Sequence, residues 1–315
     1  MRRGLVLGGG GVLGAAWITG ALGALERVEG VDVHGYEYIV GTSAGAVVAA
    51  LLGAGFTTEQ LRQHQLGTLD GSPLTDIEWD YDTATGGSRP PRPRFGPGSL
   101  GLFTSNVGRL WRLPPTAVLS AFVPEGRGSL ERVRRLVEAV TPDGGWSPHP
   151  GVWIVAMDYE TGRRVPFGRP GEPPASLSDA VAASCAIPGW FSPVVIDGHR
   201  YVDGGACSAT SVDVLAGQGL DQVDVVAPMV SAEMDQPGSL LGRLERHWRS
   251  RITKRCRHEA AKLEAEGTEV TVLGPTPEDL RAFGVNVMDA SRRLRVLETA
   301  EWTTERELQR ARRAA

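Results

Sequence analysis

Cysteine, lysine and histidine are scarce in this sequence of 315 residues. The three cysteines, at positions 185, 207 and 256, have neither the spacing of a metal site nor that of a disulfide framework, so a reducing, cytoplasmic setting is expected. A net charge of −4 gives the chain no general attraction for nucleic acid, and we expect no such partner. With 41% hydrophobic and 22% charged residues, the chain is not disordered by composition and can bury a core.

Long apolar runs are also missing. The N-terminus imitates a secretion signal, because Arg2 and Arg3 precede an uncharged run over residues 4–25. Eight of these 22 residues are glycine, and each glycine costs about 1 kcal/mol relative to alanine inside a helix. We therefore expect neither a signal peptide nor a membrane span, and any contact with a membrane would be peripheral.

Short apolar runs alternate with helical patterns along most of the chain. A strand at 4–7 leads through glycines into a helix at 15–28, and a strand at 36–40 leads through Gly41 into a helix at 44–54. This order is typical of an α/β fold with a parallel sheet and crossover helices. Further strands are expected at 152–157, 222–227 and 269–273, and further helices at 129–140, 176–184, 239–266 and 290–313.

Residues 67–128 do not follow this pattern. Within them, residues 86–98 hold four prolines, four glycines and three arginines, which argues against regular structure. Long irregular insertions in compact domains are often lids or binding loops, whereas a disordered linker would have the same composition. Both interpretations are open at this point.

The first chemical motif is the glycine run at 8–11, completed by Gly14, between the first strand and the first helix. Glycines allow a tight turn and close approach of a ligand, and the helix N-terminus favours negative charge. The run also fits the dinucleotide fingerprint, with Asp32 at the distance of a ribose-binding acid. The motif therefore predicts an anion near backbone amides, which is either a cofactor phosphate or a reaction oxyanion.

The second motif, residues 41–45, reads Gly-Thr-Ser-Ala-Gly and also lies between a strand and a helix. This context is that of a nucleophile elbow, in which Ser43 is presented at a sharp turn flanked by Gly41 and Gly45. The positive end of the following helix would favour an incipient alkoxide on Ser43. The simpler interpretation is that Ser43 only caps that helix.

The third motif is Asp203 followed by two glycines, which alone is an ordinary turn. A serine nucleophile needs a base, and the histidines that follow Ser43 in the order of a hydrolase triad are His199, His247 and His258. Two of them lie in a strongly basic helix and the third in an expected hairpin, so none fits a catalytic loop. A base other than histidine is therefore expected.

Together, these motifs resemble those of the patatin-like phospholipase family, and the segment 183–205 is also similar to the family's block around its aspartate. The resemblance covers residues 4–210, with 67–128 poorly matched. It implies a three-layer α/β/α sandwich with a mostly parallel sheet. We expect residues 1–235 to form the catalytic domain, with its insertion at 67–128, and residues 236–315 to form a mainly helical region that packs on it.

The resemblance also implies roles for individual residues. A Ser–Asp dyad without histidine would consist of Ser43 and Asp203, and no metal or organic cofactor is implied. The oxyanion hole would be formed by the backbone amides of Gly9, Gly10 and Gly11. One departure is Leu13, which stands where the family often has arginine or lysine, so a positive charge near the oxyanion site is missing.

The sequence therefore predicts a serine acyl hydrolase that cleaves carboxylic esters of lipids, of the phospholipase A or lysophospholipase type. Two alternatives are a non-catalytic membrane- or protein-binding module on the same fold and, less well supported, a dinucleotide-binding oxidoreductase. The former would not react with a fluorophosphonate, and the latter would be stabilised by NAD. The head group, acyl chain and oligomeric state are left open.

Two regions are candidates for peripheral contact with a lipid surface. The insertion places apolar side chains among arginines, and we expect it to be the main contact: Leu100, Leu102, Phe103 and Trp111. The helix at 239–266 is rich in basic residues and carries a stripe of apolar ones. We expect that stripe to pack on the sheet while the arginines face solvent: Leu240, Leu241, Leu244, Trp248 and Ile252.

Overall fold

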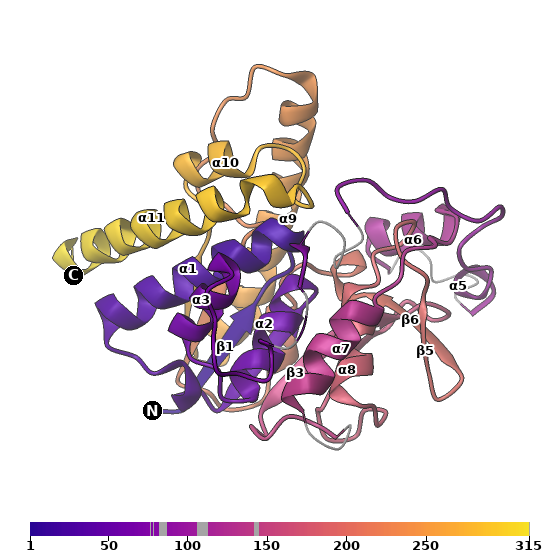
Figure 1. The fold of residues 1–315 in the computed structure, drawn as a ribbon, viewed down its shortest axis with the longest axis horizontal. Helices are drawn as coiled ribbons and strands as arrows, with labels where there is room; N and C mark the ends of the chain where they lie inside the picture. The colour runs from indigo at the N-terminus through magenta and orange to yellow at the C-terminus, as the bar shows by residue number, and fades with distance from the viewer. Residues whose placement is uncertain (76, 78, 82–86, 106–112, 142–144, 315) are drawn as a thin grey trace.

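The computed structural model describes residues 1–75, 77, 79–81, 87–105, 113–141 and 145–314. Within these residues, eight strands form one sheet (Figure 1). The strands are β1 (Arg3–Leu7), β2 (Tyr38–Thr42), β3 (Val152–Asp158), β4 (Arg164–Phe167), β5 (Val194–Ile196), β6 (His199–Asp203), β7 (Gln222–Val226) and β8 (Glu269–Leu273). Their order is β5-β6-β3-β2-β1-β7-β8, and β4 pairs with β3.

The sheet is mostly parallel, as the sequence predicts. Strands β3, β2, β1, β7 and β8 run parallel, whereas β4 and β6 pair with β3, and β5 with β6, in the antiparallel sense. Strand β8 comes from the C-terminal region and joins the same sheet through β7. The carboxyl ends of β1 and β2 therefore lie side by side, and the glycine run and Ser43 follow those two ends.

Helices cover both faces of the sheet. Those of the N-terminal part are α1 (Gly11–Glu29), η1 (Val33–Gly35), α2 (Ala44–Gly53), α3 (Thr58–Leu66), α5 (Gly101–Ser105), α6 (Pro115–Phe122) and α7 (Glu131–Val140). Those of the C-terminal part are α8 (Leu177–Cys185), η4 (Gly204–Ala206), η5 (Val212–Leu215), α9 (Leu240–Glu264), α10 (Pro277–Phe283), η6 (Ala290–Arg292) and α11 (Arg293–Ala314). Helices α2 and α8 pack directly on the sheet, α11 packs on α1, and α9 covers the opposite face with η5.

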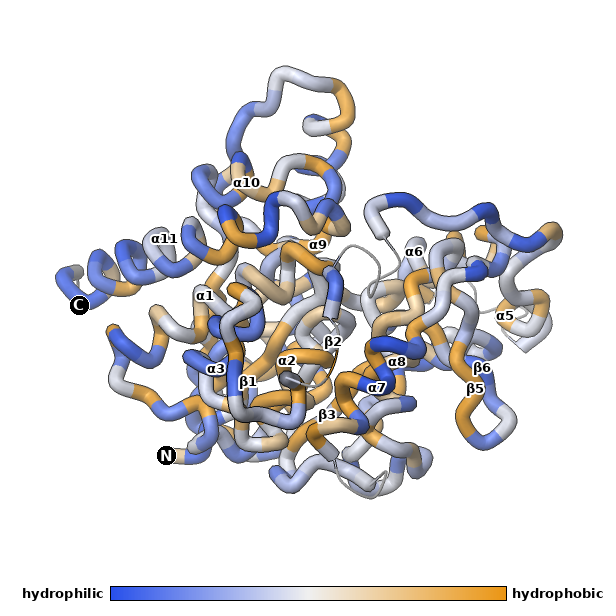
Figure 2. The backbone as a smooth tube through the Cα atoms, in the orientation of Figure 1, coloured by the Kyte–Doolittle hydropathy of each residue, from blue (hydrophilic) through white to orange (hydrophobic). Residues whose placement is uncertain are grey.

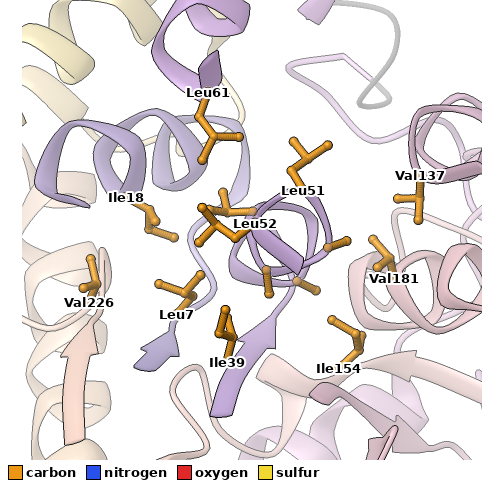
Figure 3. Packing of buried hydrophobic residues seen from close by; sticks show 14 of the residues in the cluster. Leu7, Ile18, Ile39, Leu51, Leu52, Leu61, Val137, Ile154, Val181 and Val226 are labelled. Atoms are coloured by element: carbon orange, nitrogen blue, oxygen red, sulfur yellow. The ribbon is translucent and has the colours of Figure 1, made fainter. Parts of the chain in front are cut away.

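Successive side chains of a strand point to opposite faces of the sheet, and apolar side chains on both faces explain why helices cover both. Leu5 and Leu7 point to the face covered by α1, α2 and α8, whereas Val6 between them points to the face covered by α9. Figure 3 shows the first of these cores, in which Leu7, Ile39 and Ile154 lie under helical side chains. Burying each such side chain contributes about 1.5–3 kcal/mol, so the two clusters fix both helical layers on the sheet. The structure is the α/β/α sandwich that the sequence predicts.

The insertion is more regular than its composition predicts. It contains α5 and α6, and α6 begins with Pro115 at a helical position that needs no N–H. Leu102 is fully buried and Leu100 is exposed, while Trp111 and the side chain of Phe103 lie outside the described residues. The prediction that 67–128 is irregular was therefore wrong for these two helices.

The orientation expected for the apolar stripe of the C-terminal basic helix was wrong at its N-terminal end, whereas Ile252 packs against the core as predicted. In α9 the residues Leu240, Leu241 and Leu244 are exposed, whereas Arg246 and Arg249 are buried. The two arginines can face inward because acidic side chains and backbone carbonyls meet them there: Asp235, Glu245, Pro228 O and Leu280 O. None of the helices in the described part of the chain is long and apolar enough to cross a membrane.

Candidate active site

The glycine run forms the turn between β1 and α1. Gly9 donates its N–H to Ala209 O at 2.8 Å, and the N–H of Gly8 is held by Val226 O at 2.9 Å. Within the described residues, the N–H groups of Gly10, Gly11 and Val12 have no acceptor. They lie at the positive end of a 19-residue helix, where unpaired amides form a site for negative charge. Gly9 is therefore not available as a donor in this structure.

Ser43 lies at the turn between β2 and α2 with φ of 53°, a left-handed conformation that is strained for a residue with a side chain. The flanking glycines are required by close packing. A Cβ on Gly45 would lie 2.1 Å from Leu7 O, and one on Gly41 would lie 2.5 Å from Gly45 O. This is the geometry of a nucleophile elbow.

Hydrogen bonds from the C-terminal end of α8 hold the turn at Ser43 in place. The N–H of Ser43 donates to Ser184 Oγ at 2.8 Å, and the same hydroxyl donates to Val155 O at 2.6 Å. The thiol of Cys185 reaches Ser43 O at 3.4 Å. Ser184 has no solvent exposure, so it is a buried link between the elbow and β3. Sequence analysis gave it no role, because a serine in an alanine-rich helix carries no signal of its own.

Asp203 lies next to Ser43 because β2 and β6 both pair with β3 and end at neighbouring residues of that strand. Thr42 pairs with Val155, and Asp203 pairs with the next residue of β3, Ala156. The N–H of Gly205 donates to Asp203 Oδ1 at 2.7 Å. Burial raises the pKa of Asp203 to about 6, and the neighbouring Ser43 hydroxyl and the N–H of Gly205 oppose the shift. The residue is therefore mostly ionised at neutral pH and able to take up a proton.

A cavity of about 790 Å³, including its open mouth, begins at Ser43. Most of its lining is apolar and comes from α1, α2, α7 and the segment after α8. Along α1 the lining extends from Gly11 to Thr19, which corresponds to about 12 Å at the helical rise. Such a cavity suits an aliphatic chain beside the serine.

One histidine does share this cavity. His64 on α3 lies in the lining, and one of its ring nitrogens is 2.9 Å from the hydroxyl of Tyr81. Burial, and secondarily the charge of Arg293, lower the pKa of His64 to about 4. The imidazole is therefore neutral and bonded to Tyr81. The sequence does not single it out, because a triad in the order Ser–Asp–His places its histidine late in the chain and His64 follows Ser43 by only 21 residues.

The other sequence candidates lie elsewhere. Asp32 caps η1 by accepting the N–H of His34, before the start of β2 and thus at the opposite edge of the sheet from the glycine run. It cannot bind a ribose beside that run, so the oxidoreductase alternative is wrong. His199 is exposed at the start of β6, and His247 and His258 are exposed on α9. The side chain of Leu13 is fully buried in the core.

Two of the solved structures that are similar to this chain match most of its length. One is VipD from Legionella pneumophila, with 15% identity over 95% of this chain and 67% of its own and a TM-score of 0.41. The other is the type III effector protein ExoU, with 18% identity over 98% of this chain and 53% of its own and a TM-score of 0.35. Residues 5–216 match the patatin-like phospholipase family. Since this match covers more than half of the sequence, the chain belongs to the patatin-like phospholipase family and is a lipid-hydrolysing esterase.

Proposed function

We propose that the protein cleaves carboxylic esters of lipids through a Ser43–Asp203 dyad, as a phospholipase A or lysophospholipase. The observation that carries this proposal is that the strained Ser43 and the buried Asp203 are brought together by β2 and β6, which end on neighbouring residues of β3. A carboxylate with a pKa of about 6 is ionised at neutral pH yet basic enough to accept a hydroxyl proton in the transition state.

Acylation begins when Ser43 Oγ attacks the ester carbonyl and Asp203 takes the serine proton. The carbonyl oxygen becomes an oxyanion, and the amides of Gly10 and Gly11 are the donors we assign to it. Collapse of this intermediate breaks the bond to the alcohol, which leaves with the proton from Asp203. The product is an acyl-serine ester at Ser43.

Deacylation repeats these steps with water. Asp203 takes a proton from a water molecule, whose oxygen attacks the acyl-serine carbonyl. The second oxyanion collapses, the bond to Ser43 Oγ breaks, and Asp203 returns the proton to that oxygen. The fatty acid is released, and the dyad is restored.

The hydrogen bonds within the glycine turn indicate which backbone N–H groups can donate to the oxyanion. No acceptor for the N–H groups of Gly10 and Gly11 lies among the residues that the structure describes, whereas Gly9 gives its N–H to Ala209 O. We therefore leave Gly9 out of the proposed oxyanion hole and assign it a packing role. A Cβ on Gly9 would lie 3.2 Å from Ser43 Cβ, so a small residue is needed where the two loops meet. Removing one oxyanion donor typically lowers turnover by about 10²–10³-fold.

The apolar cavity supports a lipid substrate, because it offers an acyl chain a lining that begins at the nucleophile. The decisive experiment is intact-mass analysis after incubation with a fluorophosphonate. We expect a single adduct that maps to Ser43 and is absent from Ser43→Ala. Absence of any adduct from a folded wild-type protein would favour the non-catalytic binding module instead.

A further inference from the structure

The outward surface of α9 is apolar at its N-terminal end. Leu240 is 73% exposed, Leu241 69%, Leu244 58% and Trp248 42%. In Figure 1 this end of the helix projects from the body, and Figure 2 colours part of it as hydrophobic. Large apolar side chains gathered on one exposed surface mark a site of interaction rather than ordinary surface composition. We call this surface the α9 face and define it by the exposed residues of 240–258: Leu240, Leu241, Arg243, Leu244, His247, Trp248, Arg251, Lys254, Arg257 and His258.

The charge of the α9 face has one sign. Each of its ionisable residues is basic, and within the described part of the chain no acidic side chain pairs with Arg243, Arg251, Lys254 or Arg257. Two of the three acids of this helix are turned away from the α9 face, since Glu245 is held by Arg246 and Arg249 and Glu259 is fully buried, and the exposed Glu264 follows the face at the other end of the helix. An apolar end followed by unpaired basic residues matches the boundary between acyl chains and anionic head groups.

The α9 face is linked directly to the candidate active site. Arg246, on its buried side, donates to Leu280 O at 2.9 Å and to Gly284 O at 3.3 Å. A few residues further on, Val287 O accepts the N–H of Leu13, and Met288 lines the cavity that begins at Ser43. The segment that follows α10 therefore contacts both the buried side of α9 and the glycine turn, and contributes to the lining of this cavity.

Helix α11 shows what an ordinary exposed helix in this protein looks like. It also exposes Leu294 and Trp302, but exposed acids lie among its exposed basic residues, at Glu298 and Glu307. The exposed acids of such a face are repelled by an anionic surface and offset part of the attraction of its basic residues. The α9 face has no exposed acid, and its apolar end distinguishes it from a site for nucleic acid alone, which would need only the basic residues.

We propose that the α9 face docks the protein on anionic lipid bilayers, with the leucines and Trp248 inserted at the acyl boundary and the basic residues beside the phosphates. This inference rests on the proposed function, because docking would present lipid esters to Ser43. The basic residues act additively at the surface, each contributing about fivefold to affinity, and salt should weaken them.

Binding can be measured apart from catalysis with Ser43→Ala protein and vesicles, by co-flotation. We compare vesicles of phosphatidylcholine with vesicles containing 30% phosphatidylglycerol. We expect binding to the anionic vesicles only, reduced about 100-fold by Arg243→Gln/Arg251→Gln/Lys254→Gln and at least tenfold by Leu240→Ser/Leu244→Ser/Trp248→Ser. Control changes on α11 remove three charges in Arg295→Gln/Arg312→Gln/Arg313→Gln and two exposed apolar side chains in Leu294→Ser/Trp302→Ser, and both variants should leave binding within twofold.

Several results would overturn the proposal. One is that the α11 variants lose as much binding to anionic vesicles as the α9 variants do. Another is that Leu119→Ser/Phe122→Ser on α6 loses this binding while the α9 variants keep it. A third is that the protein also binds a DNA duplex, and that the charge variant loses binding to both DNA and vesicles while the Leu/Trp variant loses neither. The α9 face would then be a general site for polyanions. If the wild-type protein were a dimer and the Leu/Trp variant a monomer, the α9 face would bind a second copy of the chain instead of a bilayer. Hydrolysis of a short soluble ester by wild-type protein that fails to bind vesicles would sink this inference and leave the proposed function intact.

Discussion

Ser43 and Asp203 are neighbours at the ends of β2 and β6, both residues are almost fully buried, and the Ser43 hydroxyl favours the ionised form of the Asp203 carboxyl. Their placement is set by the sheet, because β2 and β6 end on neighbouring residues of β3. Ser43 is held at φ of 53° by glycines that leave no room for a Cβ. The two groups are therefore positioned by strand pairing and backbone packing, which is the rigid support that a catalytic pair requires.

Removing either member of this pair should abolish most of the activity. We expect Asp203→Asn to lower kcat on a short soluble ester by about 10²–10⁴-fold, the usual contribution of a general base. Ser43→Ala should be at least as severe, and the double variant no worse than Ser43→Ala, because members of one catalytic unit are not additive. The exposed His199→Ala serves as the control and should retain wild-type kcat. A loss in His199→Ala equal to that in Ser43→Ala would refute the dyad.

Activity should fall below about pH 6. Asp203 must be ionised to accept the serine proton, and burial raises its pKa to about 6. We expect kcat/KM to drop tenfold for each pH unit below this value and to be level above it. Stopped measurements on a soluble ester from pH 4.5 to 8 would give the profile. An inflection near 4, the ordinary value for aspartate, would show that Asp203 is not the titrating base.

The same shift affects stability. The folded state of Asp203 binds its proton more tightly than the unfolded state, whose pKa is near 3.8, so ionisation costs the folded state stability as pH rises from about 4 to about 6. We expect Asp203→Asn to be more stable than wild type at pH 7.5, by up to about 3 kcal/mol, and the gain to shrink at pH 4.5. Urea unfolding at both pH values tests this. A difference that is equal at the two values would contradict it.

The site motifs could be predicted from the sequence because each constraint is local. Gly41 and Gly45 are required by backbone atoms a few residues away or on the next strand, and glycine records that requirement directly. The orientation of α9 could not be predicted in this way. Its apolar periodicity is real, but the inward face was decided by carbonyl and carboxylate partners of Arg246 and Arg249 that only the fold brings near. The cavity lining likewise depends on helices that meet only in three dimensions.

The elbow should not tolerate a larger residue at position 45. A Cβ on Gly45 would lie 2.1 Å from Leu7 O and 2.9 Å from Gly8 O, and neither backbone atom can move without breaking the sheet. We expect Gly45→Ala to lose at least about 3 kcal/mol of stability or to fail to fold. Gly35→Ala is the matched control, because nothing lies within 4 Å of its Cβ position. Thermal melts of the two variants should separate them clearly, and equal melting temperatures would contradict the close packing.

Ser184 should act on catalysis through the position of Ser43. Its hydroxyl accepts the N–H of Ser43 and donates to Val155 O, so Ser184→Ala leaves two buried polar groups unpaired, each at a cost of about 1–3 kcal/mol. We expect a lower melting temperature together with a reduced kcat and a nearly unchanged KM, because the elbow shifts while the cavity is kept. Ser178 lies in the same helix, and the hydrogen bonds of its hydroxyl among the described residues are with Ser176 and Glu138, away from the elbow. Ser178→Ala should therefore leave kcat unchanged. If Ser184→Ala lowered stability while kcat stayed at the wild-type value, Ser184 would support the fold alone, and the position of Ser43 would depend on its flanking glycines.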